Sequence, residues 1–276
     1  MAIRPARHLT LALGLGLVGA IILAGVFAPA LTGRSPFEQD LAHPFLGMSL
    51  QHPFGTDAFG RDIAVRILYG ARYSVAEAAV SIAISCSVGT LLGLACGAAG
   101  GWVDRIVMWL MDILYAFPGV VLALLIISLL GPGLANMLLA ISLFSVPVYA
   151  RLARNLAMEL RTAPFVEAAV TMGIGFPRIV LRHILPNAAG PILVQCAASA
   201  GWVILMAASL SFLGLGVQPP APEWGAMMSD GRNYVGAYIL PSLFPGLAIT
   251  LLSLGFNMIG EGLRRLSESA TLARTR

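Results

Sequence analysis

The sequence predicts an all-α, polytopic membrane protein with six transmembrane helices. Of its 276 residues, 58% are hydrophobic and only 11% are charged, whereas a soluble globular domain carries about 25% charged residues. Such a chain cannot cover a water-facing surface with polar side chains, so lipid must be its solvent. Five stretches lack Asp, Glu and Arg, and each exceeds the roughly 20 residues that cross a bilayer; they are 9–33, 78–103, 113–150, 183–222 and 233–260.

The first stretch, 9–33, follows Arg4 and Arg7 and resembles a signal peptide in that respect. Its apolar part is longer than the roughly 7–15 residues of a signal-peptide core. An uncleaved membrane anchor is therefore favoured over a cleaved signal peptide. We expect residues 1–72 to hold this helix and an outer, interfacial segment.

The other stretches supply five more helices. Residues 78–103 make one, and the turn Gly131-Pro132-Gly133 divides 113–150 into two. In 183–222 the prolines near the start and the Gly/Pro-rich end leave one helix, about 188–213, and 233–260 supplies the last. We expect residues 73–266 to form this five-helix core, and residues 267–276 to form a cytoplasmic tail.

Arginine counts predict the orientation of the chain. With six spans both termini lie on one side, together with residues 100–106 and 151–187, and that side receives 12 of the 17 arginines. The other side, 34–72 and residue 232, receives five. Basic residues are enriched in cytoplasmic loops, so the N- and C-termini are predicted to be cytoplasmic.

The sequence contains no lysine, because all 17 basic residues are arginine. A phosphate-loop lysine and a Schiff-base lysine are therefore excluded, and any ATP must be bound by another chain. No catalytic, cofactor-binding, metal-binding or nucleic-acid-binding pattern is present. Cys86, Cys96 and Cys196 all fall within predicted spans, and we expect reduced packing residues.

The segment before the second span predicts a short interfacial helix. Phe59, Ile63 and Ile67 recur at helical spacing, with Asp57 as its N-cap. Ionisable groups inside spans are functional candidates by default, but Glu77 and Asp112 lie close to predicted span ends, which favours a structural role. Three prolines, Pro118, Pro147 and Pro245, could kink their spans.

The segment 151–187 is punctuated in a way that predicts two short helices meeting at a bend. Pro164 suits the first turn of a helix, and Gly173 supplies the positive φ common at a helix end. A second helix would start after Gly175 and stop at Pro186. The residue pattern alone fits either a docking element or an amphipathic helix lying at the membrane interface.

The spacing within this loop resembles the "EAA" loop of the permeases of binding-protein-dependent ABC transporters. The family pattern is E-A-A, three residues, G, nine residues, I, one residue, L-P; here it is met by Glu167, Ala168, Ala169, Gly173, Leu185 and Pro186, with His183 in place of Ile. In that family the loop is the coupling helix that sits in a cleft of the cytoplasmic ATPase. The resemblance thus implies a type I importer permease with its coupling loop at about 160–187.

Further motifs resemble the dipeptide, oligopeptide and nickel branch of this family. They are 54–57, 60–62, 69–72, 211–216, 219–220, 223–225, 256–260 and 263–264, and together they cover roughly residues 50–266. Ala64, Val65, Glu261 and Arg265 depart from the family's usual residues, which affects the assignment of a substrate subgroup. The order of the motifs relative to the spans makes the combination specific.

The resemblance implies a C-type permease subunit in the bacterial inner membrane. Its partners would be a second permease subunit, two ATP-binding subunits that bind the ATP and Mg²⁺, and a periplasmic or lipid-anchored substrate-binding protein. Glu223, Trp224 and Gly225 are predicted to receive that protein, since a tryptophan beside a charge makes a good anchor; a tryptophan resting at the membrane interface is the alternative.

The implied function is import of di- or oligopeptides. Nickel chelates and glutathione are alternative cargoes handled by similar permeases. Two functions of another class, a polytopic membrane enzyme and an ion-coupled secondary carrier, lack the catalytic motifs or the charged mid-membrane sites that they would need.

Overall fold

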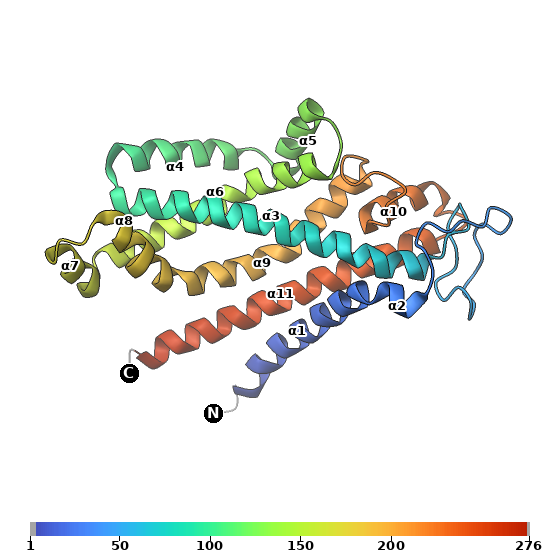
Figure 1. The fold of residues 1–276 in the computed structure, drawn as a ribbon, viewed down its shortest axis with the longest axis horizontal. Coiled ribbons are helices and arrows are strands. Elements are labelled where there is room, and N and C mark those ends of the chain that lie inside the picture. The colour runs from blue at the N-terminus through green and yellow to red at the C-terminus, as the bar shows by residue number, and fades with distance from the viewer. Residues whose placement is uncertain (1–3, 275–276) are drawn as a thin grey trace.

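The computed structural model describes the backbone of residues 4–274 and the side chains of residues 8–267. Within those residues the chain is helical without β-strands, and most helices run along one long axis (Figure 1). Its helices are α1 (Arg4–Val26), α2 (Ala28–Thr32), α3 (Ile63–Ala99), α4 (Gly101–Ala116), α5 (Gly119–Leu130), α6 (Leu134–Arg161), α7 (Pro164–Thr171), α8 (Phe176–Ile179), α9 (Leu185–Phe212), α10 (Trp224–Gly231) and α11 (Leu240–Arg274). A π-helical turn, Val180–Ile184, joins α8 to α9, and a 3₁₀ turn, Arg232–Tyr234, follows α10.

The predicted all-α membrane fold is confirmed. Among the described residues, five helical segments are long and apolar enough to cross a membrane: His8–Val26, Ile63–Ala99, Leu134–Arg161, Phe176–Phe212 and Leu240–Ser267. A bent pair, α4 and α5, makes six if it counts as one span. The start of α1, the described end of α11 and the loop around α7 lie toward one end of the bundle, and α2, α10 and the segment 33–62 lie at the other (Figure 1).

The span predicted within 113–130 is sharply broken and starts earlier than expected. Helix α4 begins at Gly101 and ends at Ala116, and α5 leaves it at an angle of 93°. Pro118 causes the break, because a proline pushes the preceding residue out of the helical region, and Phe117 is extended with φ −78° and ψ 137°. Asp104, which was expected in a loop, lies in the first turn of α4 and pairs with Arg154 of α6.

The interfacial helix and the second span are one continuous helix, α3, of 37 residues. Its N-cap is Asp62, whose side chain accepts a hydrogen bond from the Val65 amide at 3.0 Å, so the prediction of Asp57 as the cap is wrong. Asp57 instead closes the preceding turn by accepting hydrogen bonds from the amides of Phe59 and Arg61. The predicted division of the chain at residue 72 falls inside α3, where the helix has no break.

The sequence predicted that a helix stops at Pro186, and this prediction is wrong. The chain stays helical from Phe176 to Phe212, because the Val180–Ile184 segment widens into a π turn in which the amide of Leu185 donates to the carbonyl of Val180. A proline is tolerated in the first turn of the next helix, where its missing N–H costs little. Helix α9 thus begins at Leu185 rather than near residue 188, and the continuous helical segment to which it belongs begins at Phe176.

Helices α3 and α6 make the closest contact in the bundle. Gly89, Gly93 and Gly97 recur every fourth residue along α3, and each faces the backbone of α6. A Cβ atom on Gly93 would overlap the carbonyl oxygen of Ala150 and lie 2.9 Å from the Cβ of Ala153. Small residues let helix backbones approach in lipid, where packing drives helix association.

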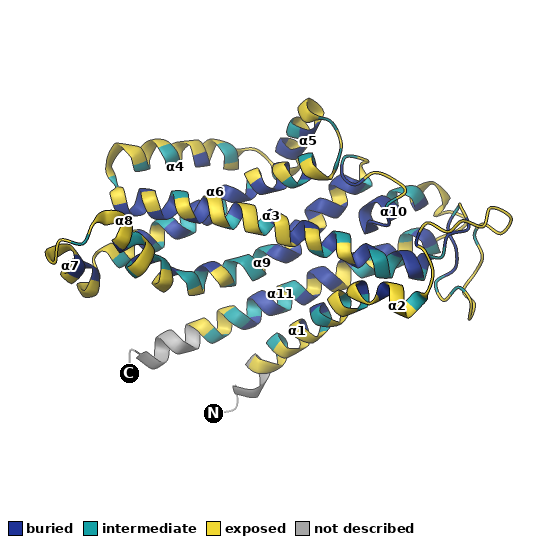
Figure 2. Cartoon of the chain, in the orientation of Figure 1, coloured by how far each residue is buried: buried dark blue, intermediate teal, exposed yellow. Residues whose placement is uncertain are grey.

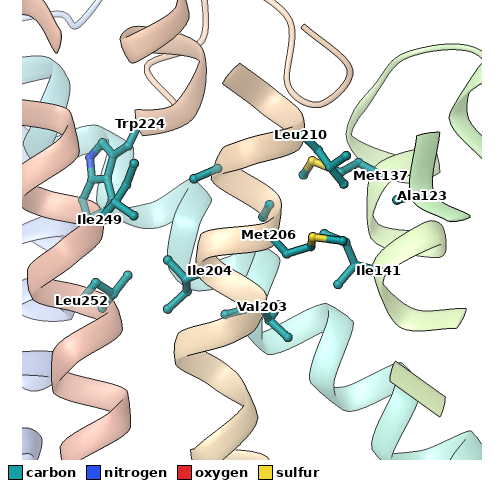
Figure 3. Packing of buried hydrophobic residues seen from close by; sticks show 14 of the residues in the cluster. Ala123, Met137, Ile141, Val203, Ile204, Met206, Leu210, Trp224, Ile249 and Leu252 are labelled. Carbon is teal, nitrogen blue, oxygen red and sulfur yellow. The ribbon is translucent and has the colours of Figure 1, made fainter. Parts of the chain in front are cut away.

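Helix α9 lies at the centre of the apolar core. In Figure 3 its residues Val203, Ile204, Met206 and Leu210 lie between two groups of side chains: Ile249 and Leu252 of α11 with Trp224 on one side, and Met137 and Ile141 of α6 with Ala123 of α5 on the other. Exposed residues cover much of α4 and α1 (Figure 2). Helix α1 packs on α11, where Gly14 meets the backbone at Gly255.

The cysteine side chains are free: Cys96 is buried, and Cys86 and Cys196 are half-buried. A separate tail was expected at 267–276, but the backbone of α11 runs on through Arg274. The side chains of residues 268–276, and those of Arg4 and Arg7, lie outside the described residues.

Replacing Gly93 by Ala tests the contact between α3 and α6. The added methyl group overlaps backbone atoms that cannot move away, so we expect a loss of about 1–3 kcal/mol, as for overpacked cores. The matched control is Gly190→Ala, because nothing lies within 4 Å of a Cβ there. Thermal unfolding in detergent should show a lower Tm for G93A and no loss for G190A; equal Tm values would contradict the packing described here.

Candidate functional site

The loop from Pro164 to Pro186 folds into the predicted bent arrangement at one end of the bundle. Pro164 occupies the first turn of α7, and Ala163 before it is extended. Gly173 has φ +75°, and the amide of Ile174 donates to the carbonyl of Ala169 at 3.1 Å. This is the hydrogen-bond pattern of a Schellman helix end, and it confirms the predicted bend at Gly173.

The three residues of the EAA motif face different ways. Ala169 is buried together with Val166, and both pack in a cluster with Ile179 and Ile184 of the returning segment. Glu167 and Ala168 are exposed. The first helix of the loop therefore has an inner face that fixes it to the bundle, and an outer face that carries the carboxylate beside a small side chain.

Besides Glu167, the loop exposes large apolar side chains, namely Phe165, Val170, Met172, Phe176 and Leu181. Three arginines, Arg161, Arg178 and Arg182, lie exposed among them in the chain. Exposed apolar groups rimmed by charge mark contact surfaces. We name this set of apolar residues, with Glu167 and Ala168, the α7 surface.

The end of the motif lies where the loop re-enters the bundle. Leu185 is half-buried against the same apolar cluster, and Pro186 is exposed. His183 lies in the π turn, and its carbonyl accepts a hydrogen bond from the side chain of Asn187 at 2.6 Å. These residues shape the junction between the loop and α9, whereas Gly173, Glu167 and Ala168 lie farther out.

Sequence reasoning missed the apolar part of the α7 surface. The motif directed attention to Glu167 and the small residues, and not to their large neighbours. A signal was available, because Phe165, Val170 and Met172 are apolar residues in a segment predicted to lie outside the bilayer. Such residues are either buried in a core or exposed for a partner protein to cover, and in α7 only Val166 and Ala169 are buried.

At the opposite end of the bundle, Glu223, Trp224 and Gly225 are buried. The exposed fraction is 0% for Glu223 and 1% for Trp224. The carboxylate of Glu223 caps α10 by accepting hydrogen bonds from the amides of Gly225 and Ala226 at 2.8 and 2.7 Å. Burial raises the pKa of this carboxyl group, and the two amide hydrogen bonds oppose the rise.

The side chain of Trp224 is buried inside the bundle and is not exposed on its surface. Its indole N–H donates to the carbonyl of Ile67 at 3.0 Å, and a Cβ on Gly225 would overlap the carbonyl oxygen of Ala208. A protein that lands on the surface of the bundle cannot touch the side chains of Glu223 and Trp224. The prediction that they form a receptor-docking site does not fit this burial; they fasten α10 to α3 and α9.

Buried charges hold the outer segment 33–62 against the bundle. Arg61 pairs with Asp57 at 2.6 Å and lies 3.4 Å from Asp230. Arg66 donates to the carbonyls of Pro36 and Pro220 at 3.1 and 3.3 Å. These contacts join segments that are distant in sequence, so they fix the position of the loop.

The same segment exposes large apolar side chains at its surface. Leu41, Met48 and Leu50 are exposed, and Phe45 stacks on Tyr238 with ring centroids 4.2 Å apart. We name Leu41, Met48 and Leu50 the outer apolar patch. The segment that carries these residues lies at the end of the bundle opposite the α7 loop (Figure 1).

Comparisons with known proteins place this geometry in a family. Residues 89–272 match the family described as "Binding-protein-dependent transport system inner membrane component". The chain is 45% identical to the dipeptide transport system permease protein of Alkalihalophilus pseudofirmus, over 91% of this chain and 83% of that protein. It is 40% identical to the glutathione transport system permease protein of Pectobacterium atrosepticum (94% and 86%), and 42% identical to a probable D,D-dipeptide transport system permease protein of Escherichia coli (89% and 83%).

Trp224→Phe separates a structural role from a docking role. The variant keeps an aromatic ring but loses the hydrogen bond to Ile67, and one intramolecular hydrogen bond contributes about 0.5–1.5 kcal/mol. We expect a lower Tm in detergent and unchanged affinity for the soluble binding protein of the same system. Loss of that affinity at unchanged Tm would restore the docking assignment.

Proposed function

Because the chain belongs to the inner membrane components of binding-protein-dependent transport systems, we propose that it is the permease subunit that carries di- or oligopeptides through the bacterial inner membrane. The observation that carries the coupling part of this proposal is the α7 surface, a set of exposed apolar side chains with Glu167 in the loop at one end of the bundle (Figure 1). Family membership removes the membrane enzyme from the alternatives.

The names of the relatives support a peptide cargo. Two of those described above are named for dipeptides and one for glutathione, which is itself a short peptide. Import of glutathione is therefore the second candidate, and none of these three names supports nickel chelates. Uptake of a labelled dipeptide, in competition with glutathione, by vesicles that hold the complete transporter distinguishes the two cargoes.

ATP is hydrolysed by partner subunits in this proposal. The chain has no lysine to bind the phosphates of ATP in a phosphate loop. Its partners are a second permease subunit, two ATP-binding subunits and a soluble or lipid-anchored substrate-binding protein, an assembly that the family resemblance supports.

The α7 surface is the contact with an ATP-binding subunit. Phe165, Val170 and Met172 would be covered there, and Glu167 would make a polar contact at the rim. Because Val166 and Ala169 fix α7 to the bundle, closure of the ATPase pushes on α6 and α9 together. The chain then changes from the inward-open to the outward-open state.

This assignment places α7 and both termini in the cytoplasm. The arginine distribution supports that orientation, with 12 of 17 on the same side as α7. The outer apolar patch, Leu41, Met48 and Leu50, then faces the periplasm. It replaces Glu223, Trp224 and Gly225 as the proposed landing surface for the substrate-binding protein, because its side chains are exposed.

Gly173→Ala tests the coupling contact. A non-glycine residue in the left-handed region costs about 1–2 kcal/mol, so the bend should open and the α7 surface should lose its shape. We expect peptide uptake and receptor-stimulated ATP hydrolysis by the reconstituted complex to fall severalfold, while membrane insertion is unchanged.

The matched control for that variant is Gly175→Ala. Gly175 lies two residues away with φ −63°, and nothing lies within 4 Å of a Cβ at either glycine. Both variants add the same methyl group to open space, and only one strains the backbone. Equal uptake by G173A and G175A would count against coupling through this bend.

Charges introduced into the outer apolar patch test the landing surface. In the double variant Met48→Glu with Leu50→Glu, binding to the receptor would bury two carboxylates, so we expect a loss of receptor affinity of at least about tenfold. ATP hydrolysis without receptor should stay the same. Gln39→Glu, which adds a charge at an exposed position of the same segment, should leave affinity close to that of the unchanged protein; a double variant that binds equally well would remove this patch from the proposal.

A further inference from the structure

An exposed ion pair lies on the flank of the bundle, away from both ends. Arg151 of α6 donates to Asp112 of α4 at 2.8 Å. The side chain of Asp112 is 65% exposed and that of Arg151 is 38% exposed. By contrast, the neighbouring pair of Arg154 and Asp104 is largely covered. The Asp112–Arg151 pair thus presents both a positive and a negative charge to whatever lies beside this flank.

The pair lies at the edge of the predicted spans, where water can reach it. Asp112 precedes and Arg151 follows the stretch 113–150 that lacks charged residues, and Arg151 belongs to the segment 151–187 that the arginine distribution assigns to the cytoplasmic side. Phe144 lies seven residues before Arg151 in α6, within the charge-free stretch. The flank therefore extends from a hydrated edge into the membrane-spanning part of the bundle.

Aromatic rings continue the flank from the ion pair across three helices. The guanidinium of Arg151 lies 4.5 Å from the ring centroid of Tyr115. Tyr115 is followed by Phe144 of α6 at 6.1 Å, and Phe144 by Trp202 of α9 at 5.4 Å. We name Asp112, Tyr115, Phe144, Arg151 and Trp202 the aromatic flank.

Resting on the proposed function, we propose that the aromatic flank lines the route of the peptide and binds it transiently as a zwitterion. The guanidinium of Arg151 meets the terminal carboxylate of the peptide, and the carboxylate of Asp112 meets its terminal ammonium. The faces of Tyr115 and Trp202 receive the ammonium or an apolar side chain as the peptide moves. Because an exposed ion pair contributes little stability, the peptide can replace each partner and leave again.

The test measures whether water reaches this flank in the complete transporter. Trp202→Cys and, as a second reporter, Tyr115→Cys are exposed to a water-soluble, cationic thiosulfonate in membrane vesicles, with and without ATP and vanadate. The modification of each cysteine is read by peptide mass spectrometry, which also separates the reporters from Cys86, Cys96 and Cys196. The control is Ile84→Cys, because Ile84 is 44% exposed and Trp202 41%, and Ile84 lies on a wholly apolar stripe of α3 with Val80 and Val88.

We expect the reporters to react roughly tenfold or more faster than I84C in at least one nucleotide state, because a thiol ionises poorly in lipid and the thiolate is the reactive form. A transported dipeptide should slow the reaction. Adding Arg151→Gln to W202C should lower the rate with an anionic thiosulfonate relative to the cationic one, which a purely structural arginine would not do.

Two reporters as slow as I84C in every nucleotide state would overturn the inference, and would mean that a helix of the partner subunit or lipid covers the flank. The failure of the proposed function gives a different result. If the complex carrying the unchanged chain imports no dipeptide while W202C still reacts fast, the flank is wet and the peptide cargo is wrong. If the dipeptide is imported and W202C does not react, only the assignment of the flank fails.

Discussion

The close contact between α3 and α6 is the constraint on which the rest of the bundle depends. In lipid there is no hydrophobic driving force between helices, so they associate by close packing and by polar contacts between helices. Gly89, Gly93 and Gly97 let α3 lie directly on the backbone of α6. Helices α4 and α5 pack on α6, and α7 continues from it. The position of α6 therefore decides where the loop with Glu167 and the flank with Arg151 lie.

The two ends of the bundle are built on opposite principles. At the end with α10, charges pair inside the protein: Asp57, Arg61 and Asp230 pair, and Glu223 caps a helix. The segment 33–62 that they hold has no regular helix or strand. At the α7 end, the loop is held by a buried apolar cluster. Large apolar side chains are exposed at both ends, so the two ends differ in what fixes the exposed segment: buried ion pairs at one, apolar packing at the other.

The sequence predicted what depends on local rules and composition. The apolar stretches located the spans, and Gly173 could be assigned a positive φ because a helix had to end there. The predictions that failed depend on contacts between segments that are distant in the sequence. Pro118 predicted a kink, but not a turn of 93°, since the angle depends on how α5 packs on α6. The sequence predicted that Trp224 either anchors a partner protein or rests at the membrane interface; instead it is buried, and its indole N–H donates to the carbonyl of Ile67, 157 residues away in the chain. Likewise, nothing local to Asp112 shows that Arg151 lies beside it.

One helix, α9, connects the features that separate arguments identified. Its start is the π turn that joins it to the α7 loop, its middle carries Trp202, and its inner face fills the core between α11 and α6 (Figure 3). A π turn is less regular than an α-helix and often lies at a functional site. A displacement of α7 can therefore be taken up partly at Val180–Ile184, and the remainder moves α9 relative to α6. That movement would separate Trp202 from Phe144, because the two rings belong to those two helices. The loop proposed to contact the ATPase and the flank proposed to face the cargo are in this way joined by a single continuous segment, Phe176–Phe212.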